Sequence, residues 1–151
     1  MRPCSIVLCG PIDAIGRAID RVTGRTGWSH VALDPGLPDG ADPLLVDIDQ
    51  HEGVRLERWS VVVAGRPSLR LELPHTCDDY VRRACMRRVG EPYSVPAMVL
   101  QPLQLAAVPG VYCSRVVAEC LPPQVRALLP TCPAPADFLL LQQHGGTRAA
   151  G

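Results

Sequence analysis

One of the seven cysteines, Cys113, lies at the junction between an apolar segment and an amphipathic segment, in residues 111–117 (VYCSRVV). If Cys113 is the first residue of a helix, one apolar face of that helix is formed by Val116, Val117, Cys120 and Leu121. Cys113 then lies at the helix N-terminus, where free backbone N–H groups and the helix dipole lower the pKa of a thiol. The position therefore predicts a cysteine that is nucleophilic near neutral pH.

A histidine that could serve this cysteine as a base is His30, in the strand-like residues 28–33 (WSHVAL). A cysteine and a histidine distant in sequence are the minimum for a thiol hydrolase or acyltransferase, because the imidazole takes the thiol proton. The alternatives are a buried packing thiol for Cys113 and a hydrogen-bonded strand histidine for His30.

The elements that must position these two residues follow from hydrophobic periodicity. Strands are predicted over residues 6–9, 28–33, 44–49, 54–60 and 68–73. Helices are predicted over residues 12–22, 78–89, 96–106, 124–129 and the segment that begins at Cys113, with Thr76 or Asp78 as cap of the second. Because the middle strands have no helices between them, the sequence predicts an α+β fold with a mostly antiparallel sheet of about five strands.

Composition restricts the classes of function. The chain has 151 residues, and we expect one catalytic domain over residues 1–144 followed by a flexible tail over residues 145–151. Lys plus Arg and Asp plus Glu both total 15, and no basic stripe occurs, so we expect no nucleic-acid partner.

The seven cysteines and the hydropathy pattern also carry information. The cysteine count is odd and no Cys-x-x-Cys pair occurs, so we expect no metal site and no cofactor. No run of 18 apolar residues is present, which predicts no transmembrane segment. The N-terminal apolar run is too short for a signal peptide, so we expect a protein that is cytoplasmic as synthesised, with export by another route left open.

Four segments together resemble a known family. Residues 28–33, 90–94 (GEPYS), 111–117 and 135–139 (PADFL) resemble, in this order, the permuted branch of the NlpC/P60 papain-like superfamily. That branch contains YiiX-like proteins and relatives of lecithin:retinol acyltransferase. His30 precedes Cys113 here, the reverse of the usual order, and Arg115 replaces an acidic residue that is frequent in the related motif. The resemblance spans most of residues 5–141 and implies a circularly permuted papain-like fold.

The resemblance also implies a mechanism. Cys113 would attack a carbonyl carbon and form a thioester, and His30 would take the thiol proton and deliver it to the leaving group. A polar residue from the strand after that of His30 would orient the imidazole. Asp47 is our first choice because it lies in the middle of that strand, and Asp49 and His51 are the alternatives.

The same resemblance suggests how substrate is held. The backbone N–H of Cys113, with a second donor, would stabilise the oxyanion. Tyr112 and Ser29 are the side chains that we expect at the substrate or the oxyanion.

Three functions remain open from the sequence. The first is a cysteine hydrolase that cleaves an amide bond, with a peptidoglycan peptide or an isopeptide as substrate. The second is an acyltransferase or thioesterase acting on lipid or acyl esters, for which the apolar residues 95–100 and 103–108 would line an acyl pocket. The third is a catalytically idle binding or assembly module, for instance in a phage or a secretion system. The sequence leaves the oligomeric state open.

Overall fold

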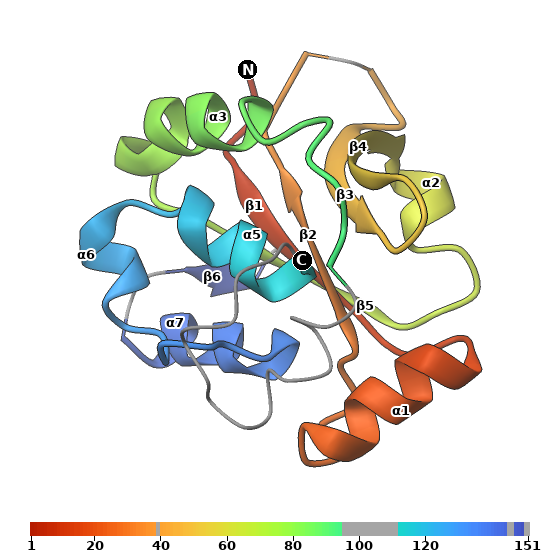
Figure 1. The fold of residues 1–151 in the computed structure, drawn as a ribbon. Helices are drawn as coiled ribbons and strands as arrows, with labels where there is room; N and C mark the ends of the chain where they lie inside the picture. The colour runs from red at the N-terminus through yellow and green to blue at the C-terminus, as the bar shows by residue number, and fades with distance from the viewer. Residues whose placement is uncertain (39, 95–111, 145–146, 150–151) are drawn as a thin grey trace.

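The computed structural model of the chain describes residues 1–38, 40–94, 112–144 and 147–149. In these residues, six strands form one sheet in the order β4-β3-β2-β1-β5-β6 (Figure 1). The strands are β1 (Ser5–Cys9), β2 (His30–Asp34), β3 (Leu44–Asp49), β4 (Gly53–Arg58), β5 (Ser68–Glu72) and β6 (Arg148–Ala149). Every neighbouring pair is antiparallel, so the predicted α+β class with an antiparallel sheet is confirmed.

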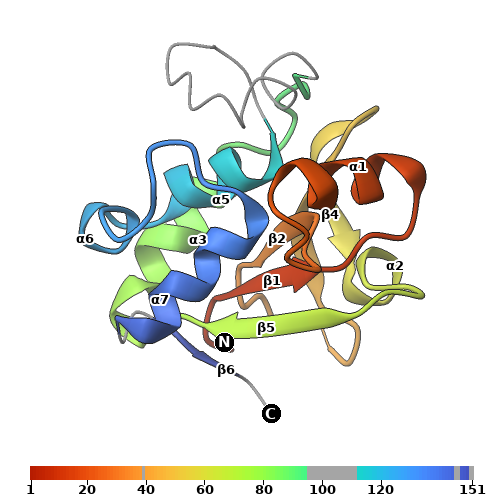
Figure 2. The ribbon, with the colours of Figure 1, turned by 90° about the horizontal axis from the view of Figure 1, so that it is seen from below.

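Helices flank the sheet on both faces. The helices are α1 (Ala14–Val22), α2 (Trp59–Val62), α3 (Asp78–Met86), α5 (Cys113–Cys120), α6 (Pro123–Arg126) and α7 (Leu140–Gln143), with 3-10 turns at His75–Cys77 and Pro135–Leu139. Figure 2 shows α3, α5 and α7 on one side of the sheet and α2 on the other. None of the helices in these described ranges is long and apolar enough to cross a membrane.

The alternation of side chains along the strands divides the core into two parts. On the α5 face, Val31, Leu33 and Val46 pack with residues of α3, α5 and the C-terminal helices. On the opposite face, Ala32 and Leu45 pack against α2 in a smaller cluster. This division places β2 directly under α5 and turns alternate residues of β2 and β3 toward the α2 side.

One predicted strand is wrong at its end. The strand predicted over residues 54–60 stops at Arg58, and Trp59–Val62 form α2. The reason is a turn held by the preceding loop: the Asp42 carboxylate accepts hydrogen bonds from the backbone N–H and the hydroxyl of Ser60, at 2.9 and 2.7 Å. The backbone N–H of Trp59 also donates to the Pro43 carbonyl at 2.7 Å.

Other elements differ from the sequence predictions at their ends. The helix predicted over residues 78–89 ends at Met86, and Cys77 takes the cap position without any side-chain hydrogen bond. Asp78, expected as a possible cap, instead accepts a hydrogen bond from the backbone N–H of Cys4 at 2.9 Å. Residues 148–149, within the predicted flexible tail, pair with β5. The helix predicted over residues 96–106 lies outside the described residues.

Candidate active site

The first element of the site is α5, which begins at Cys113 as the sequence predicted. Tyr112 is extended at the N-cap, with φ −142° and ψ 163°, and its carbonyl accepts the first helical hydrogen bond, from the Val116 N–H. Cys113 therefore has a backbone N–H without a partner inside the helix, as every first helical residue does. Its side chain is buried at the end of the apolar face that packs on β2, with only 7% of the residue exposed.

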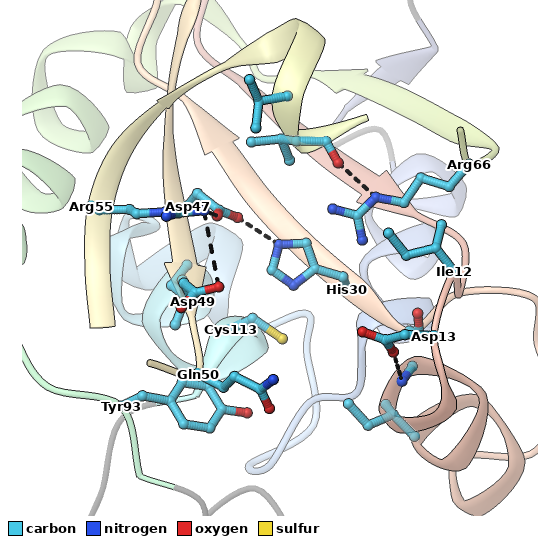
Figure 3. A pocket seen from close by; sticks show the side chains of 16 residues that line it. Ile12, Asp13, His30, Asp47, Asp49, Gln50, Arg55, Arg66, Tyr93 and Cys113 are labelled. Atoms are coloured by element: carbon cyan, nitrogen blue, oxygen red, sulfur yellow. Dashed lines mark hydrogen bonds and ion pairs between the residues drawn. The ribbon is translucent and has the colours of Figure 1, made fainter. Parts of the chain in front are cut away.

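The second element is β2, whose first residue is His30. His30 pairs with Cys9 at the end of the β1–β2 ladder, so its side chain lies at one end of the sheet. Its Nε2 atom lies 2.7 Å from Oδ1 of Asp47. The interaction between the Cys113 thiol and the same ring contributes to the pKa shifts of both groups, and Figure 3 shows the other ring nitrogen, Nδ1, turned toward the sulfur. The imidazole therefore lies between a thiol and a carboxylate.

The third element is the β3–β4 hairpin. Asp47 lies in the middle of β3 on the face opposite Val46, and its carboxylate is only 8% exposed. The register sets Arg55 of β4 directly across from Asp47, and the Arg55 Nη2 atom lies 3.4 Å from Oδ2 of Asp47. One carboxylate oxygen thus faces His30 and the other faces a guanidinium.

Neither alternative to Asp47 makes a hydrogen bond or ion pair with His30 in the part of the chain that the structure describes. Asp49 accepts hydrogen bonds from the backbone N–H groups of His51 and Glu52, at 2.7 and 3.0 Å, and so closes the hairpin turn. His51 lies exposed in that turn beside Gln50. Of the three residues named from the sequence, the structure brings only Asp47 to the imidazole.

The environment of the thiol and the imidazole favours a thiolate–imidazolium pair. Burial alone would raise the Cys113 pKa, but the hydrogen bond and charge of His30, with the backbone N–H groups of Val31 and Ser114, bring it below its ordinary value. Burial likewise lowers the His30 pKa, but the hydrogen bonds to Asp47 and Cys113 outweigh it and raise that pKa to about 9. Both shifts act in the direction of proton transfer from sulfur to imidazole.

Four other cysteines differ from Cys113 in the sign of their pKa shift. Burial raises the pKa of Cys9 to about 11 and those of Cys4, Cys85 and Cys120 to about 12. Cys120 is a close comparison because it lies two turns further along the same helix face, and no histidine is among the causes of its pKa shift. These four thiols are packing residues, protonated at neutral pH.

Asp47 stays charged although it is buried. Burial raises its pKa, but the hydrogen bond and charge of His30, the charge of Arg55 and the Ile48 backbone N–H together bring it below its ordinary value. A carboxylate that remains ionised behind a histidine holds one tautomer and stabilises the imidazolium.

A cavity of about 220 Å³ opens beside the sulfur and the imidazole. On one side it is bordered by the β2–β4 residues of the site and by Gln50 and Tyr93; on the other it is bordered by the start of α1 and by α2 (Figure 3). Ser29, predicted at the substrate, lines this cavity. The reactive groups are therefore accessible to a small part of a substrate.

Tyr112 does not line this cavity, contrary to the sequence expectation. Because Tyr112 is extended while Cys113 begins the helix, the two side chains diverge, and Tyr112 lines a second cavity with Arg115 and Cys132. Arg115, the departure from the family motif, bonds Glu119 on the same helix at 2.9 Å and borders that second cavity. The Arg115 side chain is therefore not part of the lining of the Cys113 cavity.

Among the cavity residues that the sequence reasoning did not place at the site are Arg55, Arg66 and Tyr93. Gly53 explains how Tyr93 comes to the site. Its φ is +77°, and a Cβ there would collide with the Glu91 carbonyl oxygen, which accepts a hydrogen bond from the Val54 N–H at 2.8 Å. This backbone contact holds residues 90–93 against β4. Arg55 could have been found from the sequence by predicting the β3–β4 hairpin together with its register, because that register pairs Arg55 with Asp47.

Among the described residues, no group of three or more His, Cys, Asp or Glu side chains is arranged to hold a metal ion. Neither the protein-family models nor the curated proteins include one that matches this chain.

Proposed function

We propose that this protein is a cysteine hydrolase that cleaves an amide bond through a thioester intermediate, with a peptidoglycan peptide or an isopeptide as substrate. The observation that carries the proposal is the position of the His30 ring, whose Nε2 atom lies 2.7 Å from Oδ1 of Asp47 and whose other nitrogen is turned toward the Cys113 sulfur (Figure 3). A packing cysteine or a structural histidine has no need of this arrangement.

The chemistry follows from the roles of the three side chains. The Cys113 thiolate attacks the substrate carbonyl carbon, and the negative charge moves to the carbonyl oxygen near the backbone N–H groups at the start of α5. The His30 imidazolium gives its proton to the leaving amine, which departs and leaves a Cys113 thioester. A water molecule then loses a proton to His30, attacks the thioester carbon and releases the acid and the thiolate. Asp47 keeps its charge throughout and orients the ring.

The fold class in the proposal is the circularly permuted papain-like fold. It is supported by a helix that begins with the reactive cysteine and packs on an antiparallel sheet, and by a histidine on a preceding strand, β2. The carboxylate on the neighbouring strand β3 agrees with the permuted NlpC/P60 resemblance.

An acyltransferase or a thioesterase acting on acyl esters is the second candidate. It is favoured by two apolar side chains at the cavity, Ile12 and Val61, which are 52% and 54% exposed and would contact an acyl chain. The apolar residues 95–100 and 103–108, predicted to line an acyl pocket, lie outside the described residues.

Turnover assays with trapping of the acyl-enzyme test the proposal. Muropeptides, isopeptides and short acyl esters are incubated with the wild type, with Cys113→Ser and with the matched variant Cys120→Ser. We expect turnover and an acid-stable acyl adduct on Cys113 in the wild type and in Cys120→Ser, and neither in Cys113→Ser. Turnover of amides rather than esters separates the first candidate from the second. Activity that survives in Cys113→Ser would contradict both.

A further inference from the structure

Arg66, which follows α2 in the chain, reaches into the cavity that holds Cys113 and His30 (Figure 3). Its Nε atom donates a hydrogen bond to the Val62 carbonyl at 2.6 Å, and the residue is half-buried. The guanidinium is thus held in place by the backbone of α2, and its terminal nitrogens carry four further N–H donors.

No carboxylate in the described part of the chain pairs with Arg66. By contrast, the half-buried Arg55, Arg70 and Arg88 each bond at least one carboxylate. The carboxylates that line the cavity are engaged elsewhere. Asp13 accepts a hydrogen bond from the Gly16 backbone N–H at 2.6 Å and caps α1, Asp47 faces His30 and Arg55, and Asp49 bonds the backbone of the β3–β4 turn. Within the described residues, Arg66 thus presents to a substrate in the cavity a guanidinium that has no directly paired carboxylate.

The charge of Arg66 acts on a buried thiol next to His30 in the sheet, that of Cys9. Burial raises the pKa of Cys9, but the Arg66 charge works against that rise. Cys9 pairs with His30 across the β1–β2 ladder and belongs to the same small cluster as Val62. Arg66 and Tyr93 lie apart in Figure 3, with His30 and Cys113 between them in that view. A substrate that spans the cavity would meet the guanidinium on one side of the reacting carbonyl.

We propose that Arg66 binds a carboxylate of the substrate, so that the site selects acyl compounds with a negative charge close to the bond that is cleaved. A guanidinium matches a carboxylate with two parallel N–H···O bonds, which gives geometric selection as well as charge. This inference rests on the proposed function of the same cavity and names its substrate class. The carboxylate end lies toward α2, and the remainder of the substrate lies toward Gln50 and Tyr93.

The test compares matched anionic and neutral reagents at Cys113. The first pair is iodoacetate and iodoacetamide, and the second is 3-maleimidopropionate and its primary amide. Second-order rate constants for Cys113 are measured by mass spectrometry in the wild type, Arg66→Gln, Arg66→Lys and Arg126→Gln. The ratio of the anionic to the neutral rate cancels the intrinsic reactivity of the thiolate, which both reagents share. Arg126 is the matched control because it lines the second cavity.

We expect Arg66→Gln to lower the anionic-to-neutral ratio by about fivefold, the size of one partly screened ion pair. Arg66→Lys should retain most of the ratio, and Arg126→Gln should leave it at the wild-type value. If Arg66→Gln lowers the melting temperature, Arg66→Met keeps the apolar stem and replaces it in the comparison.

Two outcomes would overturn the proposal in distinguishable ways. Equal ratios in the wild type and in the Arg66 variants, with a fast neutral reaction at Cys113, would overturn the carboxylate site and leave the proposed function intact. A slow neutral reaction at Cys113, no faster than at the other cysteines, would remove the proposed function and this inference with it.

Discussion

Replacing Asp47 by Asn tests the couple between Cys113 and His30 through the residue behind the imidazole. Asn has nearly the shape of Asp and keeps an oxygen that accepts the hydrogen bond from Nε2 of His30, which lies 2.7 Å from the Asp47 carboxylate. The substitution removes the negative charge that stabilises the imidazolium. The variant therefore isolates the electrostatic contribution of Asp47 from its packing.

The magnitude follows from the His30 pKa. Its rise from 6.5 to about 9 corresponds to about 3 kcal/mol in favour of the imidazolium, at roughly 1.36 kcal/mol for each pKa unit. Burial opposes this rise, and Asp47 and Cys113 share in causing it. Loss of the Asp47 charge alone should lower the His30 pKa by about one unit and reduce the population of the thiolate–imidazolium pair about tenfold.

The assay is the pH dependence of Cys113 alkylation by iodoacetamide. A less basic His30 supports the thiolate less well, so the Cys113 pKa rises and the acid limb of the rate profile moves toward higher pH. We expect a shift of about one unit and a rate at about pH 6 that is about tenfold lower than in the wild type. Asp49→Asn is the matched control, because Asp49 bonds the hairpin turn and not His30. Superimposable profiles for Asp47→Asn and the wild type would refute the role given to Asp47.

Three further substitutions test other parts of the account. Arg55→Gln should raise the Asp47 pKa, since Arg55 is one cause of its low value, and titration of the Asp47 carboxyl by NMR checks this; an unchanged or lower Asp47 pKa would contradict it. Ser114→Ala removes a buried hydroxyl that has no hydrogen-bond partner in the described residues. The free energy of unfolding measured in urea should therefore stay unchanged or rise by up to about 1 kcal/mol, and a clear decrease would contradict this. Asp34→Asn should lower the free energy of unfolding by about 2–4 kcal/mol, because this fully buried carboxylate pairs with two arginines. The control Asp79→Asn, at an exposed position, should change the free energy of unfolding by less than about 0.5 kcal/mol.

The parts of the site that sequence reasoning located correctly depend on local patterns. The apolar periodicity after Cys113 placed it at the start of a helix, and strand alternation set Asp47 on the face opposite Val46. Both features are properties of a short stretch of chain, so neighbouring residues suffice to predict them.

The parts that sequence reasoning missed depend on pairing between distant segments. Arg55 meets Asp47 only through the register of the β3–β4 hairpin, which the pattern of either strand alone does not contain. Arg66 reaches the cavity because a loop carboxylate, Asp42, converts the predicted end of a strand into α2. Tyr112 was misplaced because adjacency to a nucleophile in sequence does not mean adjacency in space when an extended residue precedes a helix.

The selectivity of alkylation among the seven cysteines, measured at about pH 6 with limiting iodoacetamide, tests the central claim most directly. Peptide mapping assigns a rate to each thiol in the folded protein. The account predicts rapid modification of Cys113 and slow modification of the other six, with the difference abolished in His30→Ala. Similar slow rates at all seven thiols, or a Cys113 rate that does not depend on His30, would contradict it.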